Sequence, residues 1–467
     1  MHKKLSSKCY RNEITYPALF FRPKMKSCIN ITLLLLMILQ RIFTLEECLQ
    51  KPLFSTKTPY GLIQNLDIRV NKPKDTCEVI QINMIHRHGN RYPSYKDVKN
   101  MNVAGEKINK AAETITTGVN LKLPWKSPFT KRQDKLLSHV GERELFQLGQ
   151  RILTRFPSLF KDGYSPLNYS FQSSCKLRCT HSANALAAGL FKEKGVLGEC
   201  GYQPIAIETF PCNNDPKLRF FKICEKYKVD VEENQSAMQE LTKFMNGVEV
   251  KSVIEKLSMR LGRPNLNLNA NDMWALSTAC AYELGMYNGS LDSGVCSLFD
   301  QQDRQIMEYA YDLKHFYKRS AGHKITYESS CPLLKDVIYT LDDAINNPST
   351  AYNGVFRSSH AETIIPLYAL LGVFLDEKKL KADNFAEMKY RQFRGACISP
   401  FSGHMYFVLY KCDTGYKVQM YINERLAKIP CCSSKLSCDF EVFRKCYQHI
   451  IDTCEFKKMC KIEKNEL

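Results

Sequence analysis

The chain has 467 residues, of which 44% are hydrophobic and 24% are charged, and it contains no long tract of proline, glycine or serine. This composition excludes a disordered or fibrous protein, and the length suggests two or three domain-sized units. The formal net charge is +18, of which +11 remains beyond residue 45, and since no nucleic-acid-binding module is recognisable, this charge favours a small polyanion over nucleic acid as the partner.

The first predicted element is a signal peptide within residues 1–45. Residues 29–39 form a largely apolar run that follows Lys24 and Lys26, and eleven residues are too few to cross a bilayer comfortably. A membrane anchor is the alternative that this run leaves open, because the residues up to Leu45 could lengthen it. A signal peptide would direct the chain to the secretory pathway, either to the lumen of the endoplasmic reticulum or to the outside.

A buried strand is predicted over residues 77–85, which partly alternate and are rich in β-branched side chains. A polar cluster follows directly, at the end of the strand where ligands gather in α/β sheets. In this cluster Arg87 and Arg91 can supply forked donors to a phosphoryl group, and His88 can supply a nucleophilic imidazole nitrogen. From the residues alone, a basic surface turn is an equal alternative.

The middle of the chain divides into two kinds of segment. Residues 169–175 are assigned to the same α/β domain as the first strand, and the residues after them lead into a helical run that ends at Leu190. By contrast, residues 98–125 and 222–317 are more polar and include amphipathic runs at 273–284 and 303–317. We expect these two segments to form an inserted helical cap that frames the site and selects the substrate.

A second polar cluster opens a predicted apolar helix over residues 364–374. His360 and Glu362 lie at its start, where a helix attracts anions and a carboxyl group can act as an acid. Taken singly, a capping histidine and a first-turn glutamate are ordinary helix features. Residues 405–410 then predict a further strand of the α/β domain.

Cysteines and short motifs agree with export. Eighteen of the 20 cysteines lie beyond residue 45, an even number that suits disulfides, and those from Cys431 to Cys460 have no CxxC pair or histidine cluster. We therefore expect a disulfide-stapled tail and no metal site. Three sequons, at Asn168, Asn234 and Asn288, are candidate glycosylation sites. The last four residues, Lys464, Asn465, Glu466 and Leu467, resemble the address read by the receptor that retrieves proteins to the endoplasmic reticulum.

Residues 87–93, which read RHGNRYP, are similar to the RHGxRxP signature of the histidine acid phosphatase family. Residues 173–183 resemble the second arginine-bearing segment of that family, which identifies Arg178 as a third phosphate-binding arginine. At positions 360–362 the chain reads His-Ala-Glu, which resembles the multiple inositol polyphosphate phosphatases, whereas most acid phosphatases and phytases have His-Asp. Asn90 departs from the Thr or Ala common in the family. Shorter similar stretches cover residues 312–317, 393–395, 407–410 and 418–420, so that the match runs from about Leu62 to the C-terminus.

This resemblance implies an α/β histidine phosphatase fold, with a mainly parallel central sheet flanked by helices and an inserted helical cap. The phosphatase domain would comprise residues 46–97, 126–221 and 318–467. The implied activity is hydrolysis of phosphomonoesters of inositol polyphosphates, such as inositol hexakisphosphate, through a phosphohistidine on His88. The resemblance assigns proton donation to Glu362 and phosphate binding to Arg87, Arg91, Arg178 and His360, without a metal or cofactor.

Two other functions remain as alternatives. One is a broad-specificity histidine acid phosphatase, and the other is a catalytically silent secreted protein that binds polyanions. The complete set of nucleophile, acid and cationic residues argues against the silent protein, because a binder needs the cations but neither of the other two groups.

Overall fold

The computed structural model describes residues 53–65, 73, 76–110, 119–264, 266–287, 289–432 and 436–462. The expected signal peptide, the retrieval-like tail and the Asn288 sequon lie outside these residues. Within them, no helix combines the length and the apolar character that a membrane span requires.

A single sheet forms the centre of the molecule, in the strand order β3-β2-β4-β1-β5-β6-β7, with β8 paired to β6. The bounds are β1 (Cys77–Arg87), β2 (Tyr169–Ser173), β3 (Glu208–Thr209), β4 (Gly354–Ser359), β5 (His404–Cys412), β6 (Gly415–Ile422), β7 (Arg425–Ala427) and β8 (Cys438–Asp439).

The sheet is mixed, because its two halves run differently. Strands β3, β2, β4 and β1 pair in parallel, whereas β1 pairs with β5, and β5 with β6, in antiparallel fashion. The predicted α/β class is confirmed, and the antiparallel half is where the sheet differs from the mainly parallel one that we expected. The physical reason is local: β5 and β6 are joined by a short turn ending at Gly415, whose φ is +111°, and strands joined so closely must run in opposite directions.

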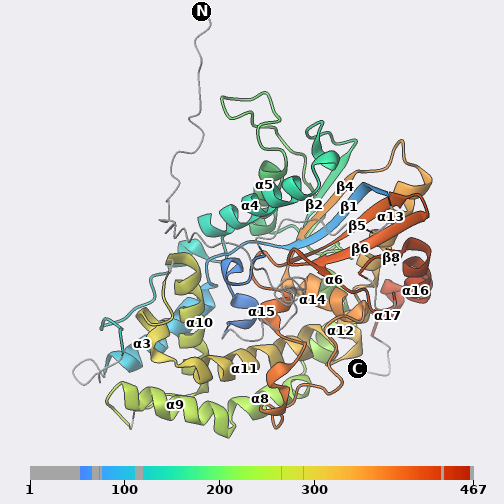
Figure 1. Cartoon of the computed structure of the whole chain (residues 1–467). Coiled ribbons are helices and arrows are strands. Elements are labelled where there is room, and N and C mark those ends of the chain that lie inside the picture. Colours follow the sequence, from blue (N-terminus) through green and yellow to red (C-terminus); the bar gives the residue numbers. More distant parts are fainter. Residues whose placement is uncertain are drawn as a thin grey trace, which may run out of the picture.

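Both faces of β1 are covered, so that its residues from Gln81 to Arg87 are all buried. Ile82 and Met84 pack on one face with residues of α4 (His139–Arg155) and α5 (Leu177–Leu190). Ile85 packs on the other face, in the cluster that contains residues of α13 (Cys331–Asn346), α14 (Ala361–Leu370) and α16 (Phe440–Asp452). The result is a sheet between two layers of helices (Figure 1).

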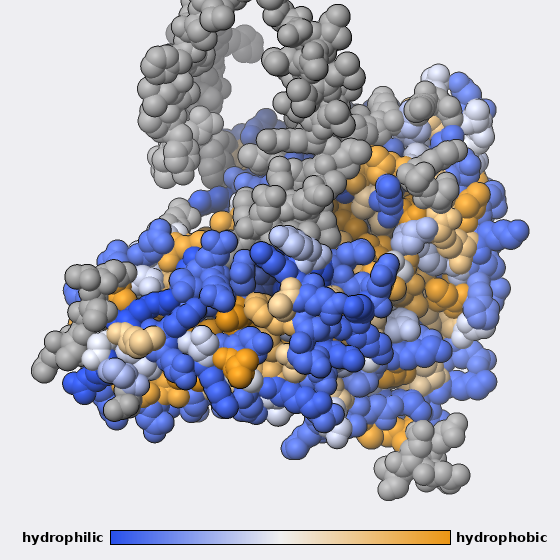
Figure 2. All heavy atoms as spheres, turned by 60° about the horizontal axis from the view of Figure 1, so that its bottom comes forward, coloured by the Kyte–Doolittle hydropathy of each residue, from blue (hydrophilic) through white to orange (hydrophobic). Residues whose placement is uncertain are grey.

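A second group of helices lies together at one side of the molecule, below and beside the strands in Figure 1. It consists of α3 (Tyr95–Asn109), α8 (Gln239–Met245), α9 (Val248–Arg260), α10 (Ala270–Tyr287) and α11 (Gln301–Arg319). The amphipathic runs predicted at 273–284 and 303–317 fall inside α10 and α11. Hydrophilic side chains cover much of the lower part of the face seen in Figure 2, with apolar residues in scattered groups between them.

The remaining helices are short. They are α6 (Phe220–Ile223), α7 (Glu225–Tyr227), α12 (Lys324–Glu328), α15 (Gly395–Ile398) and α17 (Phe456–Met459), the 3-10 helices η1 (Ser55–Lys57), η2 (Tyr60–Leu62), η3 (Lys131–Gln133), η4 (Pro157–Phe160), η6 (Ser236–Met238), η7 (Gly294–Leu298) and η8 (Glu387–Tyr390), and the π-helical η5 (Lys228–Glu232).

Seven disulfides join pairs of described cysteines, and the expected stapling of the tail is confirmed. The pairs are Cys77–Cys412, Cys175–Cys212, Cys224–Cys460, Cys280–Cys296, Cys331–Cys454, Cys431–Cys446 and Cys432–Cys438. Cys179 departs from the even pairing, since it is a buried free thiol. So many disulfides are typical of proteins from oxidising compartments.

Candidate active site

The three parallel strands β2, β4 and β1 are neighbours, so their carboxyl ends meet at one edge of the sheet. His88 follows β1, Arg178 lies in the first turn of α5 after β2, and His360 follows β4 and caps α14. Backbone hydrogen bonds hold these ends together: His88 N–H donates to the Ser359 carbonyl at 3.0 Å, and Ser174 N–H donates to the Ser358 carbonyl at 3.0 Å. The polar clusters found in the sequence therefore meet at the place where α/β sheets bind ligands.

His88 is held as a neutral imidazole with one nitrogen free to react. Only 3% of the residue is exposed, and its Nδ1 lies 2.9 Å from the Gly89 carbonyl oxygen. Because a carbonyl only accepts hydrogen bonds, Nδ1 carries the proton and Nε2 carries the lone pair. Burial, followed by the charge of Arg178, lowers the pKa of His88 well below its ordinary value, which keeps Nε2 unprotonated.

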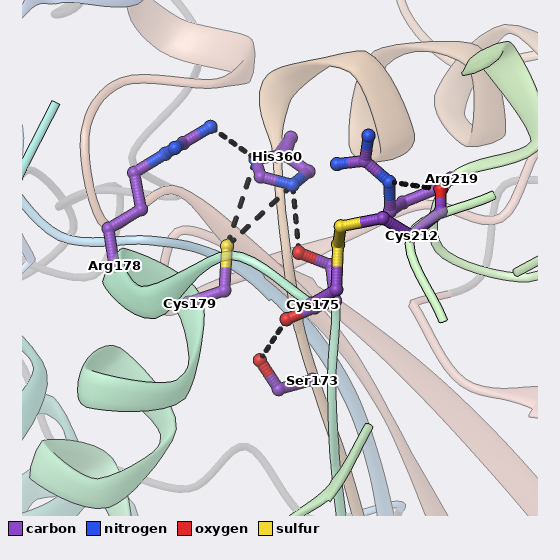
Figure 3. Close-up of a disulfide and its surroundings, with 8 residues drawn as sticks. Ser173, Cys175, Arg178, Cys179, Cys212, Arg219 and His360 are labelled. Atoms are coloured by element: carbon purple, nitrogen blue, oxygen red, sulfur yellow. Dashed lines mark hydrogen bonds between the residues drawn. A yellow bond between two sulfur atoms is a disulfide. The ribbon is translucent and has the colours of Figure 1, made fainter. Parts of the chain in front are cut away.

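His360 faces His88, with ring centroids 5.7 Å apart, and it is bonded through both nitrogens (Figure 3). The Arg178 guanidinium donates to Nδ1 at 3.2 Å, so Nε2 carries the proton and donates to Ser174 Oγ at 2.8 Å. Burial and then Arg178 lower the pKa of His360 well below its usual value. Cys179 Sγ lies 3.7 Å from Nδ1, beside the same ring.

Three arginines surround the two imidazoles without a carboxylate partner among the described residues. Arg87 donates to the carbonyls of Thr56 and Ser399 and lies 4.6 Å over the Phe401 ring. Burial, with the charge of Arg91 next, lowers the pKa of Arg87 to about 9. The Nε atoms of Arg87, Arg91 and Arg178 are buried without a hydrogen-bond partner. Guanidinium groups held in this way suit an anion with several acceptor oxygens.

Glu362 lies in the first turn of α14, and 35% of its side chain is exposed. Its Oε1 accepts a hydrogen bond of 2.6 Å from the Arg319 guanidinium on α11. Burial acts to raise the pKa of this carboxyl, but Arg319, followed by His360, lowers it well below its ordinary value. The carboxylate is therefore ionised in this arrangement.

The fold also brings to this edge four residues that were not predicted as site residues: Thr56, Lys57, His315 and Arg319. His315 Nε2 lies 2.8 Å from Thr56 Oγ1, and its Nδ1 accepts from Arg319. Lys57 lies over the Tyr282 ring at 5.5 Å. Residues 312–317, which are similar to the family, include His315. No local sequence pattern joins η1 to α11, because 259 residues separate Thr56 from His315.

A partly buried carboxylate on α4 holds the loop that begins with His88. Glu144 accepts from Asn90 N–H at 3.0 Å, from Ser402 Oγ at 2.7 Å and from Tyr60 N–H at 3.2 Å. Ser402 N–H in turn donates to the His88 carbonyl at 3.1 Å. The Asn90 side chain, which departs from the family pattern, donates to the Gly285 carbonyl of α10 at 3.1 Å, so it joins the His88 loop to the helical group.

The remaining predicted residues lie away from this edge. Asn234 is exposed and its Oδ1 accepts from Ser236 N–H at 2.9 Å, whereas Asn168 is half-buried directly before β2. Over the described ranges, no group of three or more His, Cys, Asp or Glu side chains is placed to hold a metal ion.

Comparison with known families gives one match that spans most of the chain. The family model described as the histidine phosphatase superfamily (branch 2) matches residues 78–423. This range includes all six residues proposed for phosphate binding and catalysis.

Curated relatives and solved structures are similar over nearly the whole chain. Multiple inositol polyphosphate phosphatase 1 of Gallus gallus is 31% identical, over 83% of this chain and 85% of its own, and that of Homo sapiens is 29% identical, over 88% and 89%. The fold is similar to the phytase of D. castellii, with a TM-score of 0.68 at 19% identity over 90% and 91% of the two chains. It is also similar to the Bifidobacterium longum multiple inositol polyphosphate phosphatase in complex with inositol hexasulfate, with a TM-score of 0.63 at 16% identity over 84% and 97%.

Proposed function

Because the chain belongs to branch 2 of the histidine phosphatase superfamily, we propose that it hydrolyses phosphomonoesters of inositol polyphosphates through a phosphohistidine on His88. The observation that carries this proposal is the meeting of a neutral imidazole with three guanidinium groups at one sheet edge. A phosphoryl group repels nucleophiles, and fixed cations around its oxygens lower that barrier.

In the first step, His88 Nε2 attacks phosphorus while Arg87, Arg91, Arg178 and His360 hold the phosphoryl oxygens. The N–P bond forms and the bond from phosphorus to the substrate oxygen breaks. Glu362 gives its proton to the departing alkoxide, which leaves as an alcohol. The hydrogen bond from His88 Nδ1 to Gly89 supports this step, because it orients the ring and keeps the lone pair on Nε2.

In the second step, a water molecule attacks the phosphohistidine. The Glu362 carboxylate takes a proton from this water, the N–P bond breaks, and inorganic phosphate leaves. The residue therefore serves as acid in the first step and as base in the second.

The substrate class follows from the relatives and from charge. Curated relatives at about 30% identity are multiple inositol polyphosphate phosphatases, and similar structures hold inositol hexasulfate or myo-inositol hexakis sulphate. Here further cations act on the catalytic groups: Arg219 on His360, and Lys176 on Arg178. A substrate with several phosphates would use this charge fully, whereas a simple monoester would not.

The helical segments 98–125 and 222–317 form the cap in this proposal, and residues 46–97, 126–221 and 318–467 form the phosphatase domain. Two contacts support a role of the cap at the site. Tyr282 of α10 lies under Arg91, at 5.9 Å, and Gly285 of the same helix accepts from Asn90. We further propose a secretory-pathway location with retrieval to the endoplasmic reticulum and glycosylation at the sequons; the exposed Asn234 is the most accessible described one.

Phosphate release by the purified protein tests the function. We expect release from inositol hexakisphosphate at a higher kcat/KM than from glycerol 2-phosphate, and none with the His88→Ala variant. Equal kcat/KM values for the two substrates would indicate a broad acid phosphatase. Binding of inositol hexakisphosphate without release by the wild type would indicate a silent polyanion-binding protein.

A further inference from the structure

The ion pair between Arg319 and Glu362 conflicts with the role of Glu362 as a proton donor. A general acid must carry its proton when substrate is bound, yet Arg319 lies 2.6 Å from Glu362 Oε1 and favours the ionised carboxylate. The ion pair between Arg319 and Glu362 must therefore be weakened before the first step. Two features of the structure indicate how this happens.

The first feature is the surroundings of Glu362, in which positive charge dominates. The groups that interact electrostatically with Glu362 come from β1, α5, α7, α11 and the start of α14. They are Arg87, Arg178, Cys179, Tyr227, His315, Arg319 and His360. None of these groups is an acid that is ionised at neutral pH. A substrate phosphate is therefore the natural source of the negative charge that would return the proton to Glu362.

The second feature is a row of cations and aromatic rings that leads away from the phosphate-binding arginines. Arg91 and Lys57 lie over the ring of Tyr282, at 5.9 and 5.5 Å, and Lys57 also lies over Tyr311 at 5.8 Å. The Tyr311 ring is 3.8 Å from that of Trp274, which in turn lies 5.1 Å from Lys314 Nζ.

Lys57 and Lys314 are half-buried, and neither forms an ion pair with a described carboxylate. Burial lowers the pKa of Lys57 to about 8, and burial followed by the charges of Lys57 and Arg319 lowers that of Lys314 to about 7. The charge of Asp97 acts in the opposite direction and favours the protonated form of both lysines. The charge of Arg319 acts on both lysines, so the three cations lie near enough to one another to attract a further phosphate of a polyphosphorylated substrate.

We propose that Arg319 couples recognition of a second substrate phosphate, held with Lys57 and Lys314, to the release of Glu362 as proton donor. A phosphate carries more negative charge than a carboxylate and has three acceptor oxygens, so it competes for the Arg319 guanidinium. Glu362 then takes up one proton from solvent and delivers it to the leaving oxygen. When the product departs, Glu362 releases to solvent the proton that it took from water, and Arg319 returns to the carboxylate. Arg319 is thus a positioning residue that favours polyphosphates over simple monoesters.

This inference rests on the proposed phosphatase function, and wild-type protein provides its first test. The pH dependence of kcat is measured with inositol hexakisphosphate and with glycerol 2-phosphate, and its alkaline limb reports loss of the proton from Glu362 in the enzyme–substrate complex. We expect the limb to lie about one pH unit higher with inositol hexakisphosphate. Limbs at the same pH would overturn the proposal.

The Arg319→Gln variant supplies the second test. With glycerol 2-phosphate its alkaline limb should move upward by about one unit, and the preference for inositol hexakisphosphate, as the ratio of kcat/KM values, should fall about tenfold. If Arg319 only bound phosphate or stabilised the fold, its replacement would lower activity without moving the alkaline limb for glycerol 2-phosphate. That result would contradict the proposal. Arg319→Lys keeps one positive charge, so its alkaline limb should lie between those of the wild type and Arg319→Gln.

Two controls separate this coupling from other effects. Lys318→Gln removes the same charge one residue away. Lys318 interacts electrostatically with Arg319, Glu232 and Lys222, but the ion pair of Glu362 is with Arg319, so this variant should leave both limbs in place. The kcat for p-nitrophenyl phosphate should respond little to Arg319→Gln, because its leaving group needs no acid. If the wild type hydrolyses glycerol 2-phosphate but not inositol hexakisphosphate, the proposed substrate class fails, and fructose 1,6-bisphosphate as the polyanion still tests Arg319.

Discussion

The hydrogen bond from His88 Nδ1 to the Gly89 carbonyl decides which nitrogen of the ring carries the lone pair that attacks phosphorus in the proposed reaction. A histidine that was free to exchange tautomers would present its lone pair only part of the time. Here the adjoining peptide group fixes the tautomer, and burial beside three arginines prevents protonation. Reactivity at this residue is therefore a product of its immediate neighbours.

Replacement of His88 by alanine removes the atom that bonds to phosphorus in the proposed reaction. We expect kcat to fall at least about a thousandfold with every substrate, because the remaining cations can bind phosphate but cannot accept it. Affinity for inositol hexasulfate, measured by calorimetry, should change less than tenfold. A variant that keeps a substantial part of its turnover would show that another group is the nucleophile.

The contribution of Glu362 to the rate should increase with the pKa of the leaving group. In Glu362→Gln the side chain keeps its shape but cannot give a proton, so we expect a loss of about 10²- to 10⁴-fold for inositol hexakisphosphate and a much smaller loss for p-nitrophenyl phosphate. Single-turnover measurements on both substrates check this. Equal losses would remove the acid role, and with it the coupling through Arg319.

At the scale of elements, the His88 loop and helix α4 meet through two glycines. A Cβ atom on Gly141 would lie 2.1 Å from the Asn90 carbonyl oxygen, and one on Gly89 would lie 2.4 Å from that of Gly141. The backbones therefore touch, which lets Ser138 and Glu144 of the same region bond to Asn90. The loop has its position because α4 can approach so closely.

We expect Gly141→Ala to displace the loop from α4. The clash is with backbone, which cannot rotate away, so the free energy of unfolding should fall by about 1–3 kcal/mol and kcat should fall at least about tenfold. Thermal unfolding and phosphate release measure the two effects. Gly61→Ala is the matched control, since no atom lies within 4 Å of the added Cβ there; a similar loss in both variants would refute the close-contact argument.

For the whole molecule, one disulfide joins the start of β1 to the end of β5. Cys77 and Cys412 are 335 residues apart in sequence, and Cys77 lies about 35 Å along the strand from His88 at about 3.3 Å per residue. This crosslink therefore restricts the unfolded chain strongly while it lies far from the chemistry.

The double replacement Cys77→Ser with Cys412→Ser should separate stability from activity. We expect the free energy of unfolding to fall by about 2–5 kcal/mol, with kcat unchanged at temperatures where the variant is folded. The cysteines of the Cys432–Cys438 disulfide are 6 residues apart. Its removal should lower the free energy of unfolding by less, because closing a short loop removes less entropy from the unfolded chain. Denaturant unfolding checks both, and a large loss of kcat in the first variant would show that the sheet transmits the change to the site.

The family and the candidate site residues could be predicted from the sequence, because those signals are local. RHGNRYP is seven consecutive residues, His-Ala-Glu is three, and the strand before the first motif follows from its own side chains. The tertiary structure decided what depends on distant neighbours: the antiparallel half of the sheet, the free thiol of Cys179, and the pairing of Arg319 with Glu362 across 43 residues. No periodicity links α11 to the start of α14, so the ionisation of Glu362 becomes visible only when packing places a guanidinium beside it.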